Sequence, residues 1–537
     1  MREEVALAEL GEVGIAPPGR YQPIVTVVKR RRRIDRFDLA VLAAFACLSV
    51  WVLALDLWQV VAHGMMWTGT DGVYLVDQMQ YLAWIREAAR HVLASNLFVL
   101  HPTPADYFQP AVAISGGLTA LGMAPWLALL LWKPVAVGAT FFAVRAYTRR
   151  SLTRLWQRRA ALVLGLFFGS FSIVYGSFGV VGDLFPTFES WGYTFGLLAV
   201  AALVLALISY DRARIAGRLR WTPALFGALA GLLHPWQGEL LVVIVLATEL
   251  AIWRAGERRR APLSLPAVTV IVTAIPLLYY FALGHVDESW SLARDASKHS
   301  FAIWTVALAI GPLALPAMLG YRGRSRGFLQ AATRIWPLAA LFVYLVSATG
   351  LSATPLHAFD GITIPLAVLA VYGVCRTRFT RLRRRRVLAS LAVAAATIPA
   401  TVFLLWSARG LVVPTGGNAN FITADESHAL SYLARDPTPG GVLTRFYLGT
   451  VVPAEASRAT FVGDCLWSEP GCTPRAQLAQ QLLDGTLAPS TARSFVLSTG
   501  TRFVLADCAS PADLGKLLGP VVVSARSFGC ARVYEVR

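Results

Sequence analysis

Long apolar runs recur along the chain between residues 39 and 407, and most approach the ~18 residues that a helix needs to cross a bilayer. The runs are continuous rather than alternating, which indicates membrane helices and not the strands of a barrel. Spans are expected at residues 39–62, 125–147, 160–180, 193–210, 222–235, 237–253, 264–284, 301–320, 334–350, 361–376 and 387–407. The stretch 110–122 is apolar but short, so we interpret it as a re-entrant or interfacial helix that ends before Pro125. The pattern predicts an α-helical polytopic membrane protein with about 11 spans.

Composition and charge narrow the class further. Hydrophobic residues make up 56% of the 537 residues and charged residues only 15%, which excludes a soluble cytosolic enzyme. The formal net charge is +18, but the arginines lie in short clusters between apolar runs, as at 149–159 and 376–386, so no nucleic-acid partner is expected. Short basic loops mark the cytoplasmic side. We therefore expect a multi-pass protein of the cytoplasmic (inner) membrane, in contact with membrane lipids, with its N-terminus inside and the chain beyond residue 409 outside.

Three parts follow from this topology. Residues 1–37 are polar and are expected to be a disordered cytoplasmic tail, and residues 38–408 form the transmembrane domain, with a long first outer loop at 63–109. Residues 409–537 are expected to be an extracytoplasmic α/β domain. Its predicted strands are 442–447, 502–506, 521–524 and 531–536. One predicted helix begins near residue 425, and two others cover 475–483 and 512–518. Without a Gly-rich phosphate loop or a nucleophile elbow, its simplest interpretation is a lid or a partner-binding module.

Four cysteines lie in this C-terminal segment: Cys465, Cys472, Cys508 and Cys530. An even number of cysteines outside the membrane favours disulfides, and we expect the pairs Cys465–Cys472 and Cys508–Cys530. Zinc ligation is the alternative, but the spacing contains no Cys-x-x-Cys pair and the segment's one histidine, His428, is remote in sequence.

The first outer loop carries the densest group of polar and aromatic residues. From Asp77 onward its pattern is that of an amphipathic helix lying along the membrane interface, with Asp77 at the amino-terminal end. One face of that helix carries Tyr81, Trp84, Ile85 and Ala88. A carboxylate at a helix start can simply cap the helix and complement its dipole.

The order of these features resembles the GT-C superfamily of integral membrane glycosyltransferases. The resemblance rests on the first span, the outer loop with Asp77-Gln78 followed by Tyr81, the further spans and the outer α/β tail. It implies that an acidic residue of the first outer loop is the catalytic base, here Asp77, with Asp71 as the second candidate. It also implies a polyprenyl-phosphate-linked sugar as donor. The second member of the pair is Gln78 rather than an acid, and Gln78 and Tyr81 are expected to bind substrate.

Such a transfer needs a base for the acceptor hydroxyl and positive charge near the departing phosphate. Arg86 and Arg90 on the loop helix, and Arg294 and Lys298 in the outer loop 285–300, are candidates for phosphate binding. Each of these side chains can equally be a cation that faces lipid headgroups.

Buried polar residues in the spans add further candidates. Lys133 lies inside a predicted span, where an unpaired cation is costly, so we expect it to face the interior and meet a phosphate or a carboxylate. The segment with His234, Trp236 and Glu239 interrupts two short apolar runs and is expected beside the cavity, where Trp236 would stack on a sugar; a plain polar hairpin turn is the alternative.

The sequence alone assigns no metal ligands and no certain cofactor. Asp183 and Glu189 in one outer loop, and His357 and Asp360 in another, offer ligand atoms, so a divalent metal stays open, but their spacing matches no known motif. His357 is counted among the substrate-binding candidates.

The sequence therefore favours a hexosyl- or pentosyltransferase of cell-envelope glycan assembly. Its donor would be a polyprenyl-phosphate sugar, such as mannose or arabinose, and its acceptor a glycan, a lipid or a protein on the outer face. A lipid or glycolipid transporter or flippase is one alternative, although such folds usually show internal repeats and none is evident. A noncatalytic envelope assembly factor is the other.

Overall fold

The computed structural model describes residues 34–71, 74–169, 184–256, 262–298, 303–323, 325, 327–351, 353–376, 384–414 and 417–537. Residues 41–537 form one compact unit. Most of the predicted tail, residues 1–33, and the second half of the predicted span 160–180 lie outside the described residues.

The chain is a multi-pass α-helical membrane protein. The described part contains eight helices long and apolar enough to cross a bilayer, or nine if the bent pair α1–α2 forms one span. The helices of this region are α1 (Arg36–Ser49), α2 (Trp51–His63), α5 (Pro125–Leu130), α6 (Trp132–Ser151), α7 (Leu155–Phe167), α9 (Pro186–Glu189), α10 (Thr194–Ile215), α11 (Thr222–Leu233), α12 (Pro235–Arg254), α13 (Ser264–Val286), α14 (Glu288–Ala296), α15 (Ile303–Met318), η3 (Leu319–Tyr321), α16 (Phe328–Val346), η4 (Ser347–Leu351), η5 (Pro355–Phe359), α17 (Thr363–Arg376) and α18 (Arg384–Leu411).

One of the predicted spans is shorter than a full crossing. The span predicted at 222–235 is the 12-residue helix α11, which at ~1.5 Å per residue is too short for a ~30 Å hydrocarbon core. Of the span predicted at 160–180, the described residues include helix α7, which ends at Phe167, and residues 170–180 lie outside the described part of the chain. The short helix predicted at 110–122 is present as α4 (Pro110–Ala120).

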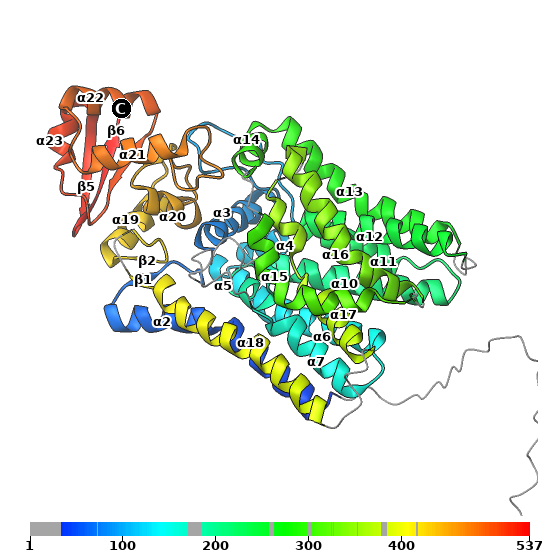
Figure 1. The fold of residues 1–537 in the computed structure, drawn as a ribbon. Coiled ribbons are helices and arrows are strands. Elements are labelled where there is room, and N and C mark those ends of the chain that lie inside the picture. Colours follow the sequence, from blue (N-terminus) through cyan, green and yellow to red (C-terminus); the bar gives the residue numbers. More distant parts are fainter. Residues whose placement is uncertain are drawn as a thin grey trace, which may run out of the picture. The chain divides into compact units, whose positions relative to one another are not determined.

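Helix burial follows the apolar pattern. Helix α10 is apolar on all sides, and 89% of its most apolar stretch is buried, as expected for a helix surrounded by other helices. Helix α18 is equally apolar, but only 11% of its most apolar stretch is buried, so most of its surface is left for lipid. It lies beside α2 (Figure 1), where the Trp51 indole N–H donates to the Leu405 carbonyl over 3.1 Å.

The first outer loop forms helix α3 (Leu75–His91) and is tied to the C-terminal segment. Strand β1 (Met66–Trp67) pairs antiparallel with β2 (Phe421–Ile422), more than 350 residues later in the chain. Helix α3 packs against α4 on one side and α20 (Phe446–Ala456) on another. The predicted helix is therefore present, and other parts of the protein cover it on several sides.

The C-terminal segment is an α/β unit around a four-stranded sheet of order β3-β4-β6-β5. Its elements are α19 (Ala424–Arg435), β3 (Val442–Leu443), α20, α21 (Cys472–Leu483), α22 (Pro489–Thr499), β4 (Phe503–Ala506), α23 (Leu514–Leu518), η7 (Gly519–Val521), β5 (Val522–Phe528) and β6 (Ala531–Val536). Strands β3 and β4 are parallel, and the other neighbours are antiparallel. The predicted strand 442–447 was wrong in its second half, because the chain turns into helix α20 at Phe446.

Alternate residues of β4 enter two different cores. Val504 and Ala506 pack with α21, α22 and α23, whereas Phe503 and Leu505 belong to a cluster that includes α19, α20 and α3. The second cluster continues to Leu233 and Leu283 of the membrane helices. The C-terminal segment therefore shares a hydrophobic core with the first outer loop and is not held by its linker alone.

Both predicted disulfides are confirmed. Cys465 is bonded to Cys472, and Cys508 is bonded to Cys530. The first bridge closes a short turn that contains Trp467. That turn is held against the first outer loop, because the Asn96 side chain donates to the Trp467 carbonyl (2.9 Å) and the Ser468 hydroxyl donates to the Phe98 carbonyl (2.9 Å).

Candidate active site

A cavity of about 430 Å³ lies where the first outer loop, the membrane helices and the C-terminal segment meet. Helix α3 contributes one wall, the break between α11 and α12 another, and α13, α14 and η5 complete it with the Leu466–Trp467 turn. Its lining includes the predicted residues Asp77, Tyr81, His234, Trp236, Glu239, Arg294 and His357.

Asp77 stands in the first turn of α3 and faces this cavity. The cap position before the helix is Tyr74, which has a left-handed backbone (φ 54°) and makes no capping hydrogen bond with its side chain. Asp77 is therefore not the capping residue, although its charge suits the positive end of the helix dipole. A half-buried carboxylate that opens into a cavity is placed to exchange a proton with a bound molecule.

The surroundings of Asp77 favour its protonated form. Burial and, to a smaller extent, the Asp464 carboxylate raise the pKa of Asp77 from 3.8 to about 7, against a lowering effect of His357. Burial also raises the pKa of Asp464, to about 6. A base with a pKa near 7 accepts protons efficiently at neutral pH.

Aromatic rings line part of the cavity into which Asp77 opens. The Trp290 ring centroid lies 4.9 Å from that of Tyr107 and 4.8 Å from that of Trp467, and Trp84 stacks on Trp290 at 6.2 Å. These rings come from the first outer loop, α14 and the disulfide-bonded turn of the C-terminal segment. Sequence reasoning missed Tyr107, Trp290 and Trp467 as site residues, because nothing local in the sequence shows that these segments meet.

The break between α11 and α12 presents His234 and Trp236 to the cavity. His234 adopts an extended backbone (φ −158°, ψ 102°), and Pro235 begins α12, where its missing N–H costs nothing. The Tyr193 hydroxyl lies 2.9 Å from His234 Nε2, and the Trp236 indole donates to the Ala353 carbonyl over 2.8 Å. These contacts fix the two rings between α10 and the segment before η5.

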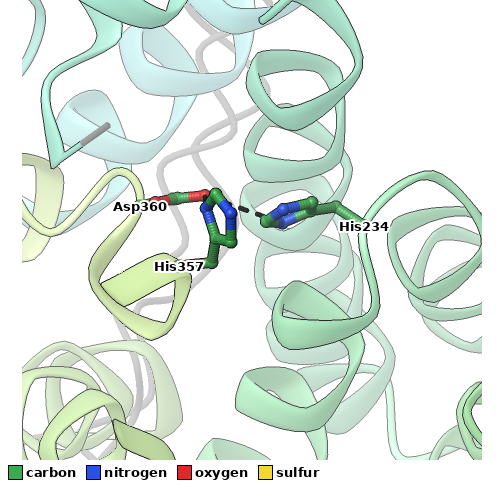
Figure 2. A group of neighbouring side chains, drawn as sticks. All are labelled: His234, His357 and Asp360. Atoms are coloured by element: carbon green, nitrogen blue, oxygen red, sulfur yellow. Dashed lines mark ion pairs between the residues drawn. The ribbon is translucent and has the colours of Figure 1, made fainter. Parts of the chain in front are cut away.

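His234 also belongs to a compact group with His357 and Asp360, which project toward it from the η5 segment (Figure 2). The Nδ1 atoms of His234 and His357 lie 3.6 Å and 3.4 Å from Asp360 Oδ2. The Asp360 side chain is fully buried, whereas both histidines reach the cavity.

Comparison with solved structures identifies the fold. The structure is similar to the arabinofuranosyltransferase AftD from Mycobacteria, with a TM-score of 0.53 and 16% identity over 93% of this chain and 41% of that one. This chain thus spans about two fifths of the length of AftD. AftD is a GT-C membrane glycosyltransferase. The chain has the GT-C fold.

Two other GT-C structures match at lower scores. ArnT from Cupriavidus metallidurans bound to undecaprenyl phosphate matches with a TM-score of 0.48 and 14% identity, over 92% of this chain and 97% of that one. The oligosaccharyltransferase AglB from Archaeoglobus fulgidus, in complex with an inhibitory peptide and a dolichol-phosphate, gives 0.43 and 15%, over 88% and 69%. No protein-family model and no curated protein matches the sequence.

Within this GT-C fold, Asp71 and Lys133 form a buried ion pair that does not line the cavity. The Lys133 ammonium also donates to the carbonyls of Ser49 (3.0 Å) and Ser190 (2.6 Å), and the Gln78 side chain accepts from the Asp71 backbone N–H (3.0 Å). Lys133 therefore faces the interior and meets a carboxylate, one of the two expected partners. Asp71 and Gln78 are engaged in structural contacts.

Three other predicted cations, Arg86, Arg90 and Lys298, are not part of the cavity lining. Arg86 pairs with Glu455 of α20 at 3.5 Å, and Lys298 pairs with Asp295 at 2.6 Å. Arg90 borders a second cavity, of about 580 Å³, between the first outer loop and the C-terminal segment. Of the five predicted cations, all described, Arg294 alone lines the main cavity. Asp183 lies outside the described residues.

Proposed function

We propose that this chain is a glycosyltransferase that moves a sugar from a polyprenyl-phosphate donor to an acceptor on the outer face of the cytoplasmic membrane. The observation that carries the proposal is Asp77, a carboxylate with a raised pKa that opens into an aromatic cavity between membrane helices and an outer domain. The GT-C fold, shared with AftD, supports the same reaction class.

Asp77 is the base of the proposed reaction. Its carboxylate takes the proton of an acceptor hydroxyl while the hydroxyl oxygen forms a bond to the anomeric carbon of the donor sugar. The bond between that carbon and the phosphate oxygen breaks, and its electron pair leaves with the polyprenyl phosphate. Attack on the face opposite the phosphate inverts the anomeric configuration.

The cavity supplies the other groups that the reaction needs. The Arg294 guanidinium lies in the cavity lining and is held by the Gly284 carbonyl (2.9 Å), so it is placed to stabilise the charge of the departing phosphate. Trp290, Trp467 and Trp236 offer flat faces on which sugar rings stack. A large apolar cavity with few convergent polar groups is typical of a small-molecule site.

Transfer from polyprenyl-phosphate sugars tests the proposal directly. Purified protein in detergent would be given labelled mannosyl and arabinosyl donors with glycan, lipid and peptide acceptors. We expect Asp77→Asn to lower kcat by ~10²–10⁴-fold while donor binding is retained, because the amide keeps the side-chain size but accepts no proton. Asp513→Asn, at an exposed helix start in the C-terminal segment, is the matched control and should retain full activity.

Two results would contradict the proposal. Full activity of the Asp77→Asn protein would remove Asp77 from the role of base. Absence of transfer from every donor, with movement of the same lipids across a reconstituted bilayer, would favour the transporter alternative.

A further inference from the structure

The group His234, His357 and Asp360 has the composition and spacing of a metal site. One ligand atom from each residue can be chosen so that all three lie within 4.8 Å of one another. Two imidazoles and one carboxylate form a ligand set typical of zinc sites with three protein ligands. The ligands come from two segments, the α11–α12 break and η5, that are more than 100 residues apart in the chain.

The distances inside the group fit shared coordination better than hydrogen bonding. The two Nδ1 atoms lie 3.6 Å and 3.4 Å from Asp360 Oδ2, beyond the ~2.7–3.2 Å of an ordinary N–H···O bond. Ligands bound tetrahedrally to zinc at 2.0–2.1 Å are separated by about 3.3–3.4 Å. Both histidine–aspartate separations are therefore close to the spacing of two ligands on one ion.

Neighbouring contacts hold the ligands in place. Tyr193 engages the Nε2 atom of His234, which leaves Nδ1 directed toward Asp360. The Gln237 side chain donates to the His357 carbonyl over 3.2 Å, and the Tyr193 ring stacks on the His357 ring at 5.4 Å. Partners of this kind orient metal-binding histidines and raise metal affinity.

We propose that His234, His357 and Asp360 bind a zinc-type divalent cation at the wall of the cavity. Imidazole favours zinc and neighbouring transition metals, whereas magnesium prefers a site made of oxygen ligands. Three protein ligands leave a fourth position, and both histidines reach the cavity into which Asp77 also opens. Resting on the proposed function, we assign that open position to an oxygen of the donor phosphate.

Metal binding is tested without any transfer assay. The full chain would be purified through a tag without histidine, stripped with a chelator, dialysed against zinc, manganese or magnesium, and analysed for bound metal by mass spectrometry. We expect about one zinc per chain, and at least ~100-fold weaker binding in His234→Ala, His357→Ala and Asp360→Asn. His63→Ala, at the exposed end of α2, should bind zinc as the unchanged protein does.

A second variant separates a metal site from a simple ion-pair cluster. Tyr193→Phe removes only the hydroxyl that orients His234, so zinc affinity should fall by ~10–100-fold with the ligands intact. The cobalt-substituted protein should show nitrogen and oxygen ligands without sulfur. The proposal would be overturned if the protein without substitutions bound no zinc, or if the ligand variants bound zinc as tightly as that protein does.

The donor-phosphate arm uses polyprenyl phosphate added to the cobalt protein. A change in the cobalt absorption spectrum is expected, and a spectrum that does not respond would overturn the assignment of the fourth position. Zinc binding in a protein that transfers no sugar would refute the proposed function but leave the metal site standing. Sugar transfer by a protein that binds no zinc would refute the metal site but leave the proposed function standing.

Discussion

The buried ion pair between Asp71 and Lys133 offers a sharp test of how the first outer loop is anchored. The side chains are only 1% and 6% exposed, and Lys133 comes from α6 while Asp71 precedes α3. Removing one member leaves a desolvated charge in the interior, which typically costs ~3–5 kcal/mol. We therefore expect Asp71→Asn and Lys133→Met each to lower the free energy of unfolding by this amount.

The double variant should recover much of the loss, because methionine fills the space of lysine without a charge and asparagine keeps the shape of aspartate. The coupling energy from a double-mutant cycle should exceed ~2 kcal/mol, measured by denaturant unfolding in detergent with tryptophan fluorescence. The matched control is the exposed pair Lys516–Asp513, at 3.6 Å, whose coupling should stay below ~1 kcal/mol. Equal coupling in both cycles would refute the claim that the buried pair anchors the loop.

The same variants separate the two candidate bases. If Asp71 only holds the loop, the double variant regains sugar transfer together with stability. If Asp71 is itself the base, transfer stays lost in the double variant however stable it is. That outcome would move the catalytic role from Asp77 to Asp71.

Three further predictions concern the cavity. Because a protonated carboxyl accepts no proton, kcat/KM should fall as the pH drops below about 7. Asp464→Asn should shift this fall to lower pH, because it removes a charge that raises the pKa of Asp77. An unshifted pH profile would show that Asp464 does not influence the base. Trp467→Phe should raise the acceptor KM by up to ~10-fold, whereas the exposed Trp253→Phe should not change it. Cys465→Ser/Cys472→Ser should cost ~2–3 kcal/mol and lower transfer more than Cys508→Ser/Cys530→Ser, because only the first bridge borders the cavity; equal activities would contradict this.

The membrane fold could be predicted from sequence because each span is a local property. An apolar run of the right length needs no partner to be recognised, and nine candidate spans of the structure coincide with predicted ones, counting the bent pair α1–α2 once. The disulfides could also be predicted from the sequence, since four cysteines in one outer segment leave few possible pairings. Asp77 was singled out by the resemblance to the GT-C superfamily, because a carboxylate at the start of a periodic helix can by itself be a simple cap.

Long-range contacts could not be predicted in the same way. Strands β1 and β2 are two residues long, and a two-residue strand has no periodicity to detect. The short run at 442–447 is consistent with either a strand or a helix. In the structure it ends as a strand at Leu443 and continues as helix α20 from Phe446, where the helix packs between α3 and the sheet. The approach of His234 to Asp360 likewise depends on the tertiary packing of α12 on η5.

The shared core explains why the cavity depends on three regions at once. Met79 and Ile85 of α3 are fully buried in the same cluster as Leu448 and Val451 of α20, so the wall that carries Asp77 is supported from the C-terminal side. The Trp467 turn of that side closes the cavity and is hydrogen-bonded to the first outer loop. The C-terminal segment thus contributes to the cavity lining, and its sequence separation from Asp77 reflects chain order only. Because part of the apolar face of α3 is buried against α20, the C-terminal segment supports the cavity wall as well as covering it.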